Sequence, residues 1–390
     1  MNIWRLAVLG LLALSGLAPA MTPDTPPTRL WSAPPVLSQA PIALLADLSS
    51  GQVLFSRDAD KRFLPASMTK AMTALVAFDL IAAGELDEHT VVTVRDETAQ
   101  RWAGKGTTLN LRPGEAVTVA DLLMGTTTVS ANDAAVALAE AAAGSADNFV
   151  ALMNARAHAL GMAGSHFGTP NGLPDRGRTY VTANDLVRLA TALIKQHPAL
   201  YARYFGKKSM IWRGARYTSH DPFAGVLPGA DGIKTGHTYE AGFNFLGAVE
   251  REGRRLVVVI GGVRTEPDRA AAATALAEWG YSAWRSVAFL PMGTIVGEAK
   301  VQGGSQRQVA LIVPRAFSLA IPLGQNPKVS GKIVYQGPLK APLAQGTPVG
   351  RLDIYIEGQP VHSLPVVTGK SISRAGPIDR IVNALLELFA

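Results

Sequence analysis

A serine and a lysine lie three positions apart in the stretch Pro65-Ala66-Ser67-Met68-Thr69-Lys70, where a long apolar segment begins. One helical turn brings side chains with that spacing to the same face. A serine hydroxyl is a weak nucleophile until a base takes its proton, and a lysine kept neutral by burial and by nearby cations can be that base. The pair therefore predicts covalent catalysis by Ser67 with Lys70 as its general base, although Ser-x-x-Lys alone is common in ordinary helices.

Two further polar triplets follow along the chain, Ser130-Ala131-Asn132 and Lys234-Thr235-Gly236. Alone, the first is an ordinary helix N-cap and the second a common turn. Together with the serine and the lysine they stand in the order known for serine enzymes that react with penicillin. Their joint order, and the strand pattern that follows Lys234, make coincidence a poor explanation.

With these motifs the chain resembles the low-molecular-weight penicillin-binding proteins, the D-alanyl-D-alanine carboxypeptidase (serine peptidase) family. The resemblance extends to segments 65–70, 130–134 and 231–238 and covers essentially the whole chain. It implies an α+β fold, with a penicillin-binding/β-lactamase-like transpeptidase domain in which helices cover an antiparallel sheet. It also implies that Ser67 is acylated by the peptidoglycan stem pentapeptide with release of the terminal D-alanine, and that β-lactam antibiotics are covalent inhibitors.

The same resemblance gives roles to the residues around the nucleophile. It implies that Ser130 relays a proton to the departing amine. Asn132 would hold the substrate's backbone amide and help to fix Lys70. The backbone N–H groups of Ser67 and His237 would stabilise the oxyanion.

The resemblance also implies a binding site for the substrate's terminal carboxylate. Lys234, Thr235 and Gly236 would form one strand edge, where Lys234 and Thr235 attract the carboxylate and Lys234 lowers the proton affinity of Lys70. Arg264, at the end of the expected strand 256–263, resembles a family arginine that helps to bind the same carboxylate.

One segment departs from the family pattern. Ahead of Lys234 the family usually shows a loop with Arg and Asn that leads to a Leu-Leu pair, whereas this chain has Arg216-Tyr217-Thr218-Ser219-His220-Asp221-Pro222-Phe223. No residue of that loop is assigned a role, and substrate contacts there stay open.

Other activities fit some of the motifs. A D,D-endopeptidase that cleaves peptidoglycan crosslinks shares all three motifs and is the main alternative. A serine β-lactamase shares the acylation chemistry, but class A enzymes deacylate with a loop glutamate, and no glutamate occurs between Glu140 and Glu240. Complete motifs argue against an inactive binding protein, and missing ligand spacing argues against a zinc carboxypeptidase.

Hydrophobic spacing predicts the elements that hold these motifs. Segments 41–47 and 52–56 flank a Ser-Ser-Gly turn and indicate a hairpin. Apolar residues at helical spacing from Ser67 to Gly84 predict a buried helix that carries the nucleophile. Further helices are expected near 119–123, 130–143, 146–160 and 183–196, then paired strands at 243–248 and 256–260 and a helix over 268–284 that packs on the sheet.

The length of 390 residues predicts two domains. The catalytic domain is expected over 36–285 and a small all-β domain over 286–373, with strands such as 309–313, 332–335 and 352–356. Residues 1–20 combine Arg5, an apolar run and the small-residue site Ala18-Pro19-Ala20, which predicts a cleavable signal peptide. Residues 21–35 form a Pro-rich N-terminal segment.

Residues 374–390 place apolar residues on one stripe and charged residues opposite it, which predicts an amphipathic helix. The resemblance favours a helix that lies on a membrane surface, while docking on the protein or dimerisation stays open. With the signal peptide, this predicts an exported protein, peripherally anchored at the periplasmic face of the inner (cytoplasmic) membrane.

The composition excludes several kinds of site. The chain has no cysteine, so disulfides and thiolate chemistry are excluded. The seven histidines lack ligand spacing, and we expect neither a metal nor any other cofactor. The net charge of +7 suits an acidic wall polymer or an anionic membrane surface, but no basic run with interleaved aromatics indicates a nucleic-acid partner.

Overall fold

The computed structural model describes residues 34–377. They form two units, one of helices around a sheet, in residues 34–49 and 53–282, and one of strands, in residues 283–377 together with Ser50–Gln52. The α+β class and the β-rich domain that follows the first are confirmed. The expected signal peptide, nearly all of the Pro-rich segment, and residues 378–390 of the expected terminal helix lie outside the described residues.

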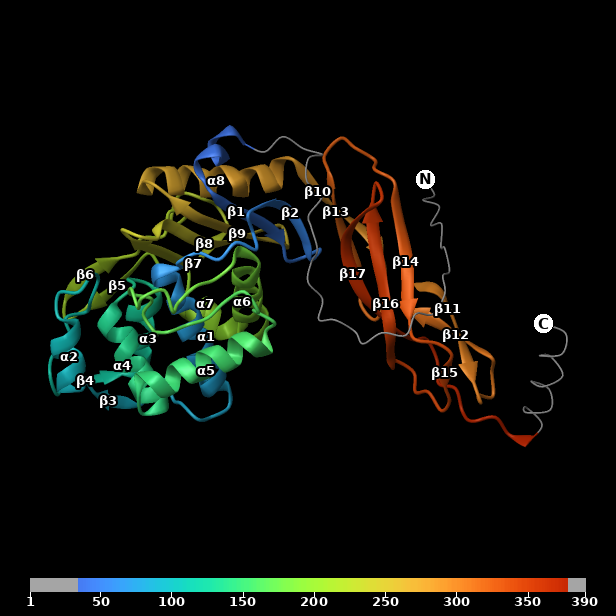
Figure 1. The fold of residues 1–390 in the computed structure, drawn as a ribbon, viewed down its shortest axis with the longest axis horizontal. Coiled ribbons are helices and arrows are strands. Elements are labelled where there is room, and N and C mark those ends of the chain that lie inside the picture. The colour runs from blue at the N-terminus through green and yellow to red at the C-terminus, as the bar shows by residue number, and fades with distance from the viewer. Residues whose placement is uncertain (1–33, 378–390) are drawn as a thin grey trace. The chain divides into compact units, whose positions relative to one another are not determined.

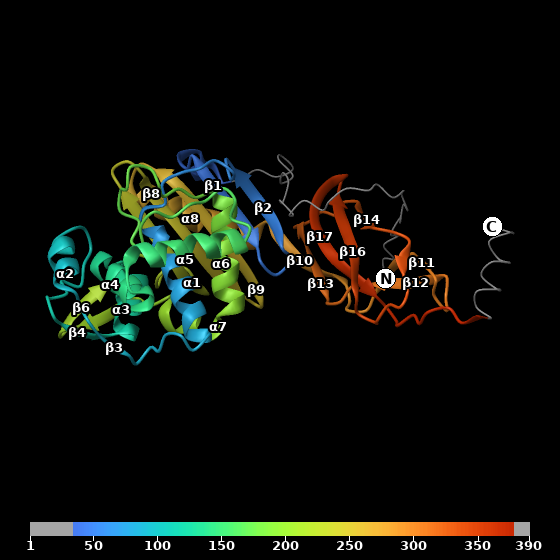
Figure 2. The same cartoon turned by 60° about the horizontal axis from the view of Figure 1, so that its bottom comes forward.

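The first unit is built on a five-stranded antiparallel sheet, shown in Figures 1 and 2. The expected hairpin at 41–56 and the strands after Lys234 are confirmed. Side chains of β1 and β9 are almost all buried because helices cover both faces of the sheet. In spatial order the strands are β2 (Gln52–Arg57), β1 (Ile42–Asp47), β9 (Arg254–Val263), β8 (Gly242–Arg251) and β7 (Ala230–Thr238).

Helix α8 (Glu266–Ser282) covers one face of this sheet, and the helical layer that contains α1 (Thr69–Ala82) and α6 (Ala183–Gln196) covers the opposite face (Figure 1). Helix α8 packs against β1, β8 and β9. The expected helix 268–284 is therefore displaced toward the N-terminus, and Trp284 begins strand β10 instead. A short helix, η1 (Pro35–Gln39), also contacts α8.

Helix α1 (Thr69–Ala82) is the central helix of the opposite layer. Every residue from Thr69 to Phe78 is buried, which is typical of a helix enclosed on all sides. The one-turn helix η2 (Ala66–Met68) leads into it. The surrounding elements are β3 (Val91–Thr93), α2 (Asp96–Trp102), β4 (Ala116–Thr118), α3 (Val119–Thr127), α4 (Asn132–Ala143), α5 (Ala146–Ala159), α6 (Ala183–Gln196), α7 (Pro198–Tyr204), β5 (Ser209–Trp212) and β6 (Ala215–Thr218).

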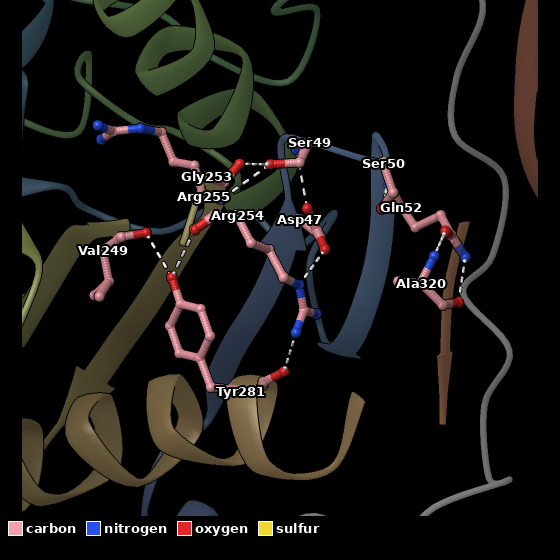
Figure 3. A network of polar contacts seen from close by, with 11 residues as sticks. Asp47, Ser49, Ser50, Gln52, Val249, Gly253, Arg254, Arg255, Tyr281 and Ala320 are labelled. Atoms are coloured by element: carbon pink, nitrogen blue, oxygen red, sulfur yellow. Dashed lines mark hydrogen bonds and ion pairs between the residues drawn. The ribbon is translucent and has the colours of Figure 1, made fainter. Parts of the chain in front are cut away.

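A buried ion pair ties the sheet to α8 (Figure 3). The Asp47 side chain is fully buried and accepts a 2.7 Å hydrogen bond from Nε of Arg254. Nη1 of Arg254 donates to the carbonyl of Gly280, and the Tyr281 hydroxyl contacts the carbonyls of Val249 and Arg254. These bonds join β1, β8 and β9 to the end of α8, so they fix the layer that carries β7.

The second unit contains its own apolar core, in which Leu311, Ile354 and Val366 are buried. A six-stranded sheet and a two-stranded sheet enclose it. The expected strands 332–335 and 352–356 fall within β14 and β16, and the expected strand 309–313 overlaps β12 but extends one residue past its end. The strands are β10 (Trp284–Leu290), β11 (Ile295–Gln302), β12 (Gln308–Ile312), β13 (Phe317–Pro322), β14 (Val329–Tyr335), β15 (Leu339–Lys340), β16 (Pro348–Ile356) and β17 (Gln359–Thr368).

Within residues 34–377, no single helix is both long enough and apolar enough to cross a bilayer. Helices α4 and α5 meet that test only as a pair, and the pair is bent by 85°.

Candidate active site

Ser67 and Lys70 meet at the start of α1. Ser67 lies in η2, and Lys70 lies in the first turn of α1, so one turn separates them. Oγ of Ser67 is 2.8 Å from Nζ of Lys70. Ser67 is partly exposed, whereas Lys70 is fully buried. The nucleophile is therefore accessible from solvent, whereas its base is enclosed by protein.

The surroundings of Lys70 favour its neutral form. Burial, followed by the charge of Lys234, lowers the pKa of Lys70 well below its usual value, and the nearby carboxylate of Asp133 opposes that shift. Nζ of Lys70 lies 2.7 Å from Oδ1 of Asn132 and 2.7 Å from the carbonyl oxygen of Asn171. A neutral amine has two N–H donors for those two acceptors, which leaves its lone pair for the hydroxyl proton of Ser67.

Asn132 is held from both sides at the first position of α4. Its backbone N–H donates to the carbonyl of Thr107 at 2.8 Å, and Nδ2 donates to the carbonyl of Lys105 at 2.8 Å. The second bond turns Oδ1 toward Lys70. The structure therefore brings Asn132 to the position that the sequence predicted, with segment 105–107 as a support that the motifs did not reveal.

Asp133 anchors the residues that follow segment 105–107. Its buried carboxylate accepts hydrogen bonds from the backbone N–H groups of Leu109 at 2.9 Å and Leu111 at 3.0 Å. These residues are distant in the chain from Asp133 and closely follow segment 105–107, so the carboxylate joins α4 to the chain next to the segment that supports Asn132.

Ser130 lies between α3 and α4, two residues before Asn132. It is buried, with 7% of its surface exposed, and its φ of 69° is in the left-handed region that L-residues seldom adopt. In the part of the chain that the structure describes, its hydroxyl has no recorded hydrogen-bond partner. A hydroxyl held in a strained backbone and left unpaired is available to a substrate.

Lys234 lies on β7 and is buried, with 4% of its surface exposed. Burial and then the charge of Arg269 lower its pKa to about 7. Arg269 is also buried; it pairs with Glu266 at 2.8 Å in the first turn of α8. Two cations thus share one buried environment, which is an arrangement suited to a carboxylate.

Arg269 is the residue that the motifs missed. Arg264, predicted for this role, is exposed just after β9, and within residues 34–377 it has no recorded hydrogen bond or ion pair. Its role stays a prediction. Arg269 follows by five positions in the chain, on the buried side of a helix, and nothing in its immediate sequence marks it as a partner of Lys234.

Thr235, Gly236 and His237 complete the motif on β7. Thr235 is buried, and the ring of His237 stacks on Phe243 with the ring centroids 3.9 Å apart. A Cβ at Gly236 would collide with the carbonyl oxygen of Pro65. Glycine is therefore required there for η2, and with it Ser67, to approach β7 so closely.

The segment 216–223, which departs from the family pattern, reaches this cationic region. Nη2 of Arg269 contacts the carbonyl of His220 at 3.4 Å. Burial, followed by the charge of Lys234, lowers the pKa of His220. Burial raises the pKa of Asp221, although Lys234 and Arg269 act in the opposite direction. The divergent loop thus adds titratable groups beside the two cations.

No group of three or more histidine, aspartate or glutamate side chains in residues 34–377 is arranged to hold a metal ion. The chemistry that the site can perform uses its own side chains: a serine nucleophile, a buried amine as base, and a cationic region for a carboxylate. These features define a serine hydrolase of the penicillin-binding class.

Comparison with known families agrees with that class. Residues 31–265 match the peptidase S11 family, D-alanyl-D-alanine carboxypeptidase, and residues 284–374 match the C-terminal domain of penicillin-binding protein 5. The chain belongs to the D-alanyl-D-alanine carboxypeptidase family of serine peptidases.

Several relatives match over most of their length. The D-alanyl-D-alanine carboxypeptidase DacA of Escherichia coli K12 is 33% identical over 89% of this chain and 87% of its own. DacD of Salmonella typhimurium is 32% identical over 97% of both chains. Penicillin-binding protein 5 of Haemophilus influenzae has a similar structure, with a TM-score of 0.77 and 29% identity over 86% of this chain and 98% of its own.

A further structure was solved with a β-lactam bound. Penicillin-binding protein D2 of Listeria monocytogenes, in its ampicillin-bound form, has a TM-score of 0.56 and 30% identity, over 62% of this chain and 97% of its own.

Proposed function

We propose that this protein removes the terminal D-alanine from peptidoglycan stem pentapeptides through an acyl-enzyme on Ser67. The observation that carries the proposal is the 2.8 Å approach of Ser67 Oγ to the buried Nζ of Lys70. A neutral lysine at that distance takes the hydroxyl proton as the oxygen attacks. Membership of the carboxypeptidase family supports the substrate class.

Acylation proceeds in balanced steps. The Ser67 oxygen bonds to the carbonyl carbon of the penultimate D-alanine while its proton passes to Lys70. The bond from that carbon to the leaving nitrogen then breaks, and a proton passes through Ser130 to the departing amine. Water next attacks the ester and frees both Ser67 and the shortened peptide. Backbone N–H groups of Ser67 and His237 are proposed to hold the oxyanion.

Substrate recognition is proposed to use the buried cations. Lys234 and Arg269 attract the carboxylate of the terminal D-alanine, with Thr235 donating a hydrogen bond. Asn132 donates to the substrate's backbone amide carbonyl through the second N–H of Nδ2, because the first donates to Lys105. β-Lactam antibiotics present a carboxylate and a strained amide to the same groups, so we propose that they acylate Ser67 and inhibit the enzyme.

The test is D-alanine release from an N-acylated D-Ala-D-Ala peptide. Wild-type protein should release D-alanine, and both penicillin and the Ser67→Ala substitution should abolish release. A crosslinked muropeptide dimer supplied in parallel measures D,D-endopeptidase activity, the main alternative. Cleavage of the dimer without D-alanine release would replace the carboxypeptidase proposal by the endopeptidase.

A serine β-lactamase is a weaker alternative because no glutamate lies between Glu140 and Glu240 to activate a deacylating water. Repeated turnover of penicillin, instead of a single acylation of Ser67, would support it.

We also propose that residues 1–20 direct export and that residues 374–390 anchor the protein peripherally at the periplasmic face of the inner membrane. The proposal rests on the sequence pattern of these segments. Deletion of residues 376–390 should move the mature protein from the membrane fraction to the soluble fraction without loss of peptide hydrolysis. Retention of the truncated protein on membranes would contradict it.

A further inference from the structure

The positive charge of the chain is concentrated in the β-rich unit. Residues 34–282 contain 24 lysines and arginines and 24 aspartates and glutamates, whereas residues 283–377 contain ten and three. With histidine neutral, the unit of helices around a sheet is therefore uncharged overall, and the β-rich unit has a formal charge of +7. Every residue assigned to catalysis or substrate binding lies in the first unit, so the proposed hydrolysis does not account for this charge.

Five of the ten cations lie at one end of the β-rich unit. The turn 303–307, between β11 and β12, is bonded through its backbone to residues 373–375. Strand β15 lies beside the same end of β11, where Lys340 is opposite Gln302 (Figure 1). Pro377, the last described residue, is two positions past these contacts. We call this region the basic end, and its cations are Lys300, Arg307, Lys340, Lys370 and Arg374.

The basic end has a large excess of positive charge. Four of its five cations are exposed, and Arg307 is partly buried. Within residues 34–377, none of the five side chains has a recorded hydrogen bond or ion pair, whereas Arg351, elsewhere in the unit, pairs with Asp353 at 3.0 Å. Glu298 is the one carboxylate in segments 295–307, 339–345 and 369–377. A surface of this kind attracts anionic partners.

The place where the chain leaves the unit indicates which anionic partner meets the basic end. Residues 378–390 follow at once, and at most about 14 Å of extended chain separates Arg374 from residue 378. The sequence of this segment predicts an apolar stripe that inserts among lipid headgroups. It contains two acids and one base, so it adds no attraction to anionic lipids. A lipid surface that binds the segment therefore comes close to cations that the segment itself lacks.

We propose that the basic end of the β-rich unit binds the anionic headgroups of a lipid bilayer and makes membrane binding selective for anionic lipids. The apolar residues of the terminal segment supply the affinity that does not depend on lipid charge, and the basic end supplies the part that does. The inference rests on the proposed peripheral anchoring of the protein.

The test is co-sedimentation of the protein without residues 1–20 with lipid vesicles. The vesicles consist of phosphatidylcholine alone or of phosphatidylcholine with about 30% phosphatidylglycerol, which is anionic. At about 0.1 M salt, we expect the partition coefficient to be roughly 30-fold higher on the anionic vesicles. That excess should shrink to a few-fold at about 0.5 M salt, because salt screens the attraction.

Two fourfold variants with the same change in charge separate the basic end from the rest of the unit. The basic-end variant combines Lys300→Gln, Lys340→Gln, Lys370→Gln and Arg374→Gln. The control variant removes four exposed cations elsewhere in the β-rich unit and combines Arg285→Gln, Arg315→Gln, Lys328→Gln and Lys332→Gln.

The basic-end variant should lose most of its preference for anionic vesicles and bind phosphatidylcholine vesicles as the wild type does. The control variant should keep the preference within about twofold, because its substituted positions lie outside the basic end. D-alanine release from a soluble peptide should be unchanged in both variants, since no substituted residue lies in the catalytic unit. Thermal unfolding checks that both variants are folded.

Three outcomes would overturn the inference. An unchanged preference in the basic-end variant would show that these cations do not meet the lipid. An equal loss in both variants would assign the effect to the net charge of the unit. Loss of binding to lipid-free peptidoglycan by the basic-end variant, with its lipid preference intact, would assign the surface to an acidic wall polymer.

The phosphatidylcholine vesicles distinguish the inference from the anchoring on which it rests. Binding to anionic vesicles alone, lost in the basic-end variant and retained after deletion of residues 376–390, would contradict the proposed anchoring segment and leave the basic end as the lipid contact. Failure of the wild type to bind either kind of vesicle would overturn both proposals together.

Discussion

Nζ of Lys70 lies 2.7 Å from Oδ1 of Asn132, and the orientation of that amide is set by a third residue. Nδ2 of Asn132 donates to the carbonyl of Lys105, which leaves only the oxygen to face the lysine. A Cβ at Gly106 would approach the same Nδ2 atom within 2.9 Å, so segment 105–107 fits closely over the amide. The catalytic base therefore depends on a segment that carries none of the three motifs.

Asp133→Ala should weaken this support. The substitution leaves the backbone N–H groups of Leu109 and Leu111 without their acceptor, which costs on the order of 2–3 kcal/mol in the free energy of unfolding. Acylation by penicillin should slow as Asn132 loses its position, and Asp133→Asn, which keeps one acceptor oxygen, should be intermediate. Stopped-flow acylation and thermal unfolding measure the two effects. Asp147→Ala, an exposed aspartate in the first turn of α5, is the control, and equal acylation rates in the two alanine variants would contradict the prediction.

The pKa of Lys234 gives a pH dependence. Its pKa is lowered to about 7, so in the free enzyme its positive charge is present below pH 7 and is lost as the pH rises through that value. Because the substrate carboxylate needs this charge, kcat/KM for peptide hydrolysis should fall as the pH rises above about 7. The fall in kcat should occur at a higher pH, because the bound carboxylate favours the charged form of Lys234. On the acid side, activity should fall only as Lys70 becomes protonated, well below the usual range for lysine.

Lys234→Arg tests this assignment. Arginine keeps its charge throughout the measurable range, so the alkaline limb of kcat/KM should disappear in the variant. A limb at an unchanged pH in Lys234→Arg would show that another group titrates there.

The two candidate arginines can be compared directly. Arg269→Gln should raise KM for a D-Ala-D-Ala peptide by roughly tenfold, because a buried cation beside Lys234 is lost. It should also move the alkaline limb to higher pH, because a like charge no longer lowers the pKa of Lys234. Arg264→Gln removes an exposed guanidinium and should change KM little. Steady-state kinetics decide between them, and the reverse ranking would return the role to Arg264.

Gly236→Ala tests the contact between η2 and β7. The added Cβ collides with the carbonyl of Pro65, so Ser67 must move away from the strand, and a displacement of about 1 Å costs roughly 100-fold in rate. Gly144→Ala is the matched control. Gly144 follows the last residue of α4 with a φ of 76°, and a Cβ added there would meet no atom within 4 Å, so alanine should cost about 1 kcal/mol of stability and leave acylation unchanged. Normal acylation by the Gly236→Ala variant would contradict the required close approach.

Much of the fold was predictable from short-range pattern. Apolar residues at helical spacing identified α1, and a turn between two apolar runs identified the β1–β2 hairpin. The end of α8 was misplaced because Trp284 continues the apolar spacing of the helix, yet it pairs with Pro322 in the second unit. A periodic pattern does not show which neighbour buries a side chain.

The active site likewise contains residues that the sequence identified and residues that it did not. Short motifs mark Ser67, Lys70, Asn132 and Lys234, which is why the sequence identified them. The structure places Ser67 and Asn132 within hydrogen-bond distance of Lys70 Nζ. The carbonyl of Asn171, which also contacts Lys70, has no signature because every residue has a carbonyl. Arg269 comes from a helix packed on the far side of the motif, and only the tertiary fold brings it to Lys234.

The edge position of β7 has a consequence beyond the site itself. A strand with one unpaired side presents a row of hydrogen-bonding groups to any extended chain, and natural proteins usually shield such rows to prevent aggregation. Here shielding would also close the nucleophile to its peptide. Self-association through this edge therefore competes with substrate binding. A concentrated solution of the protein should aggregate more slowly when a peptide or a β-lactam is bound beside β7.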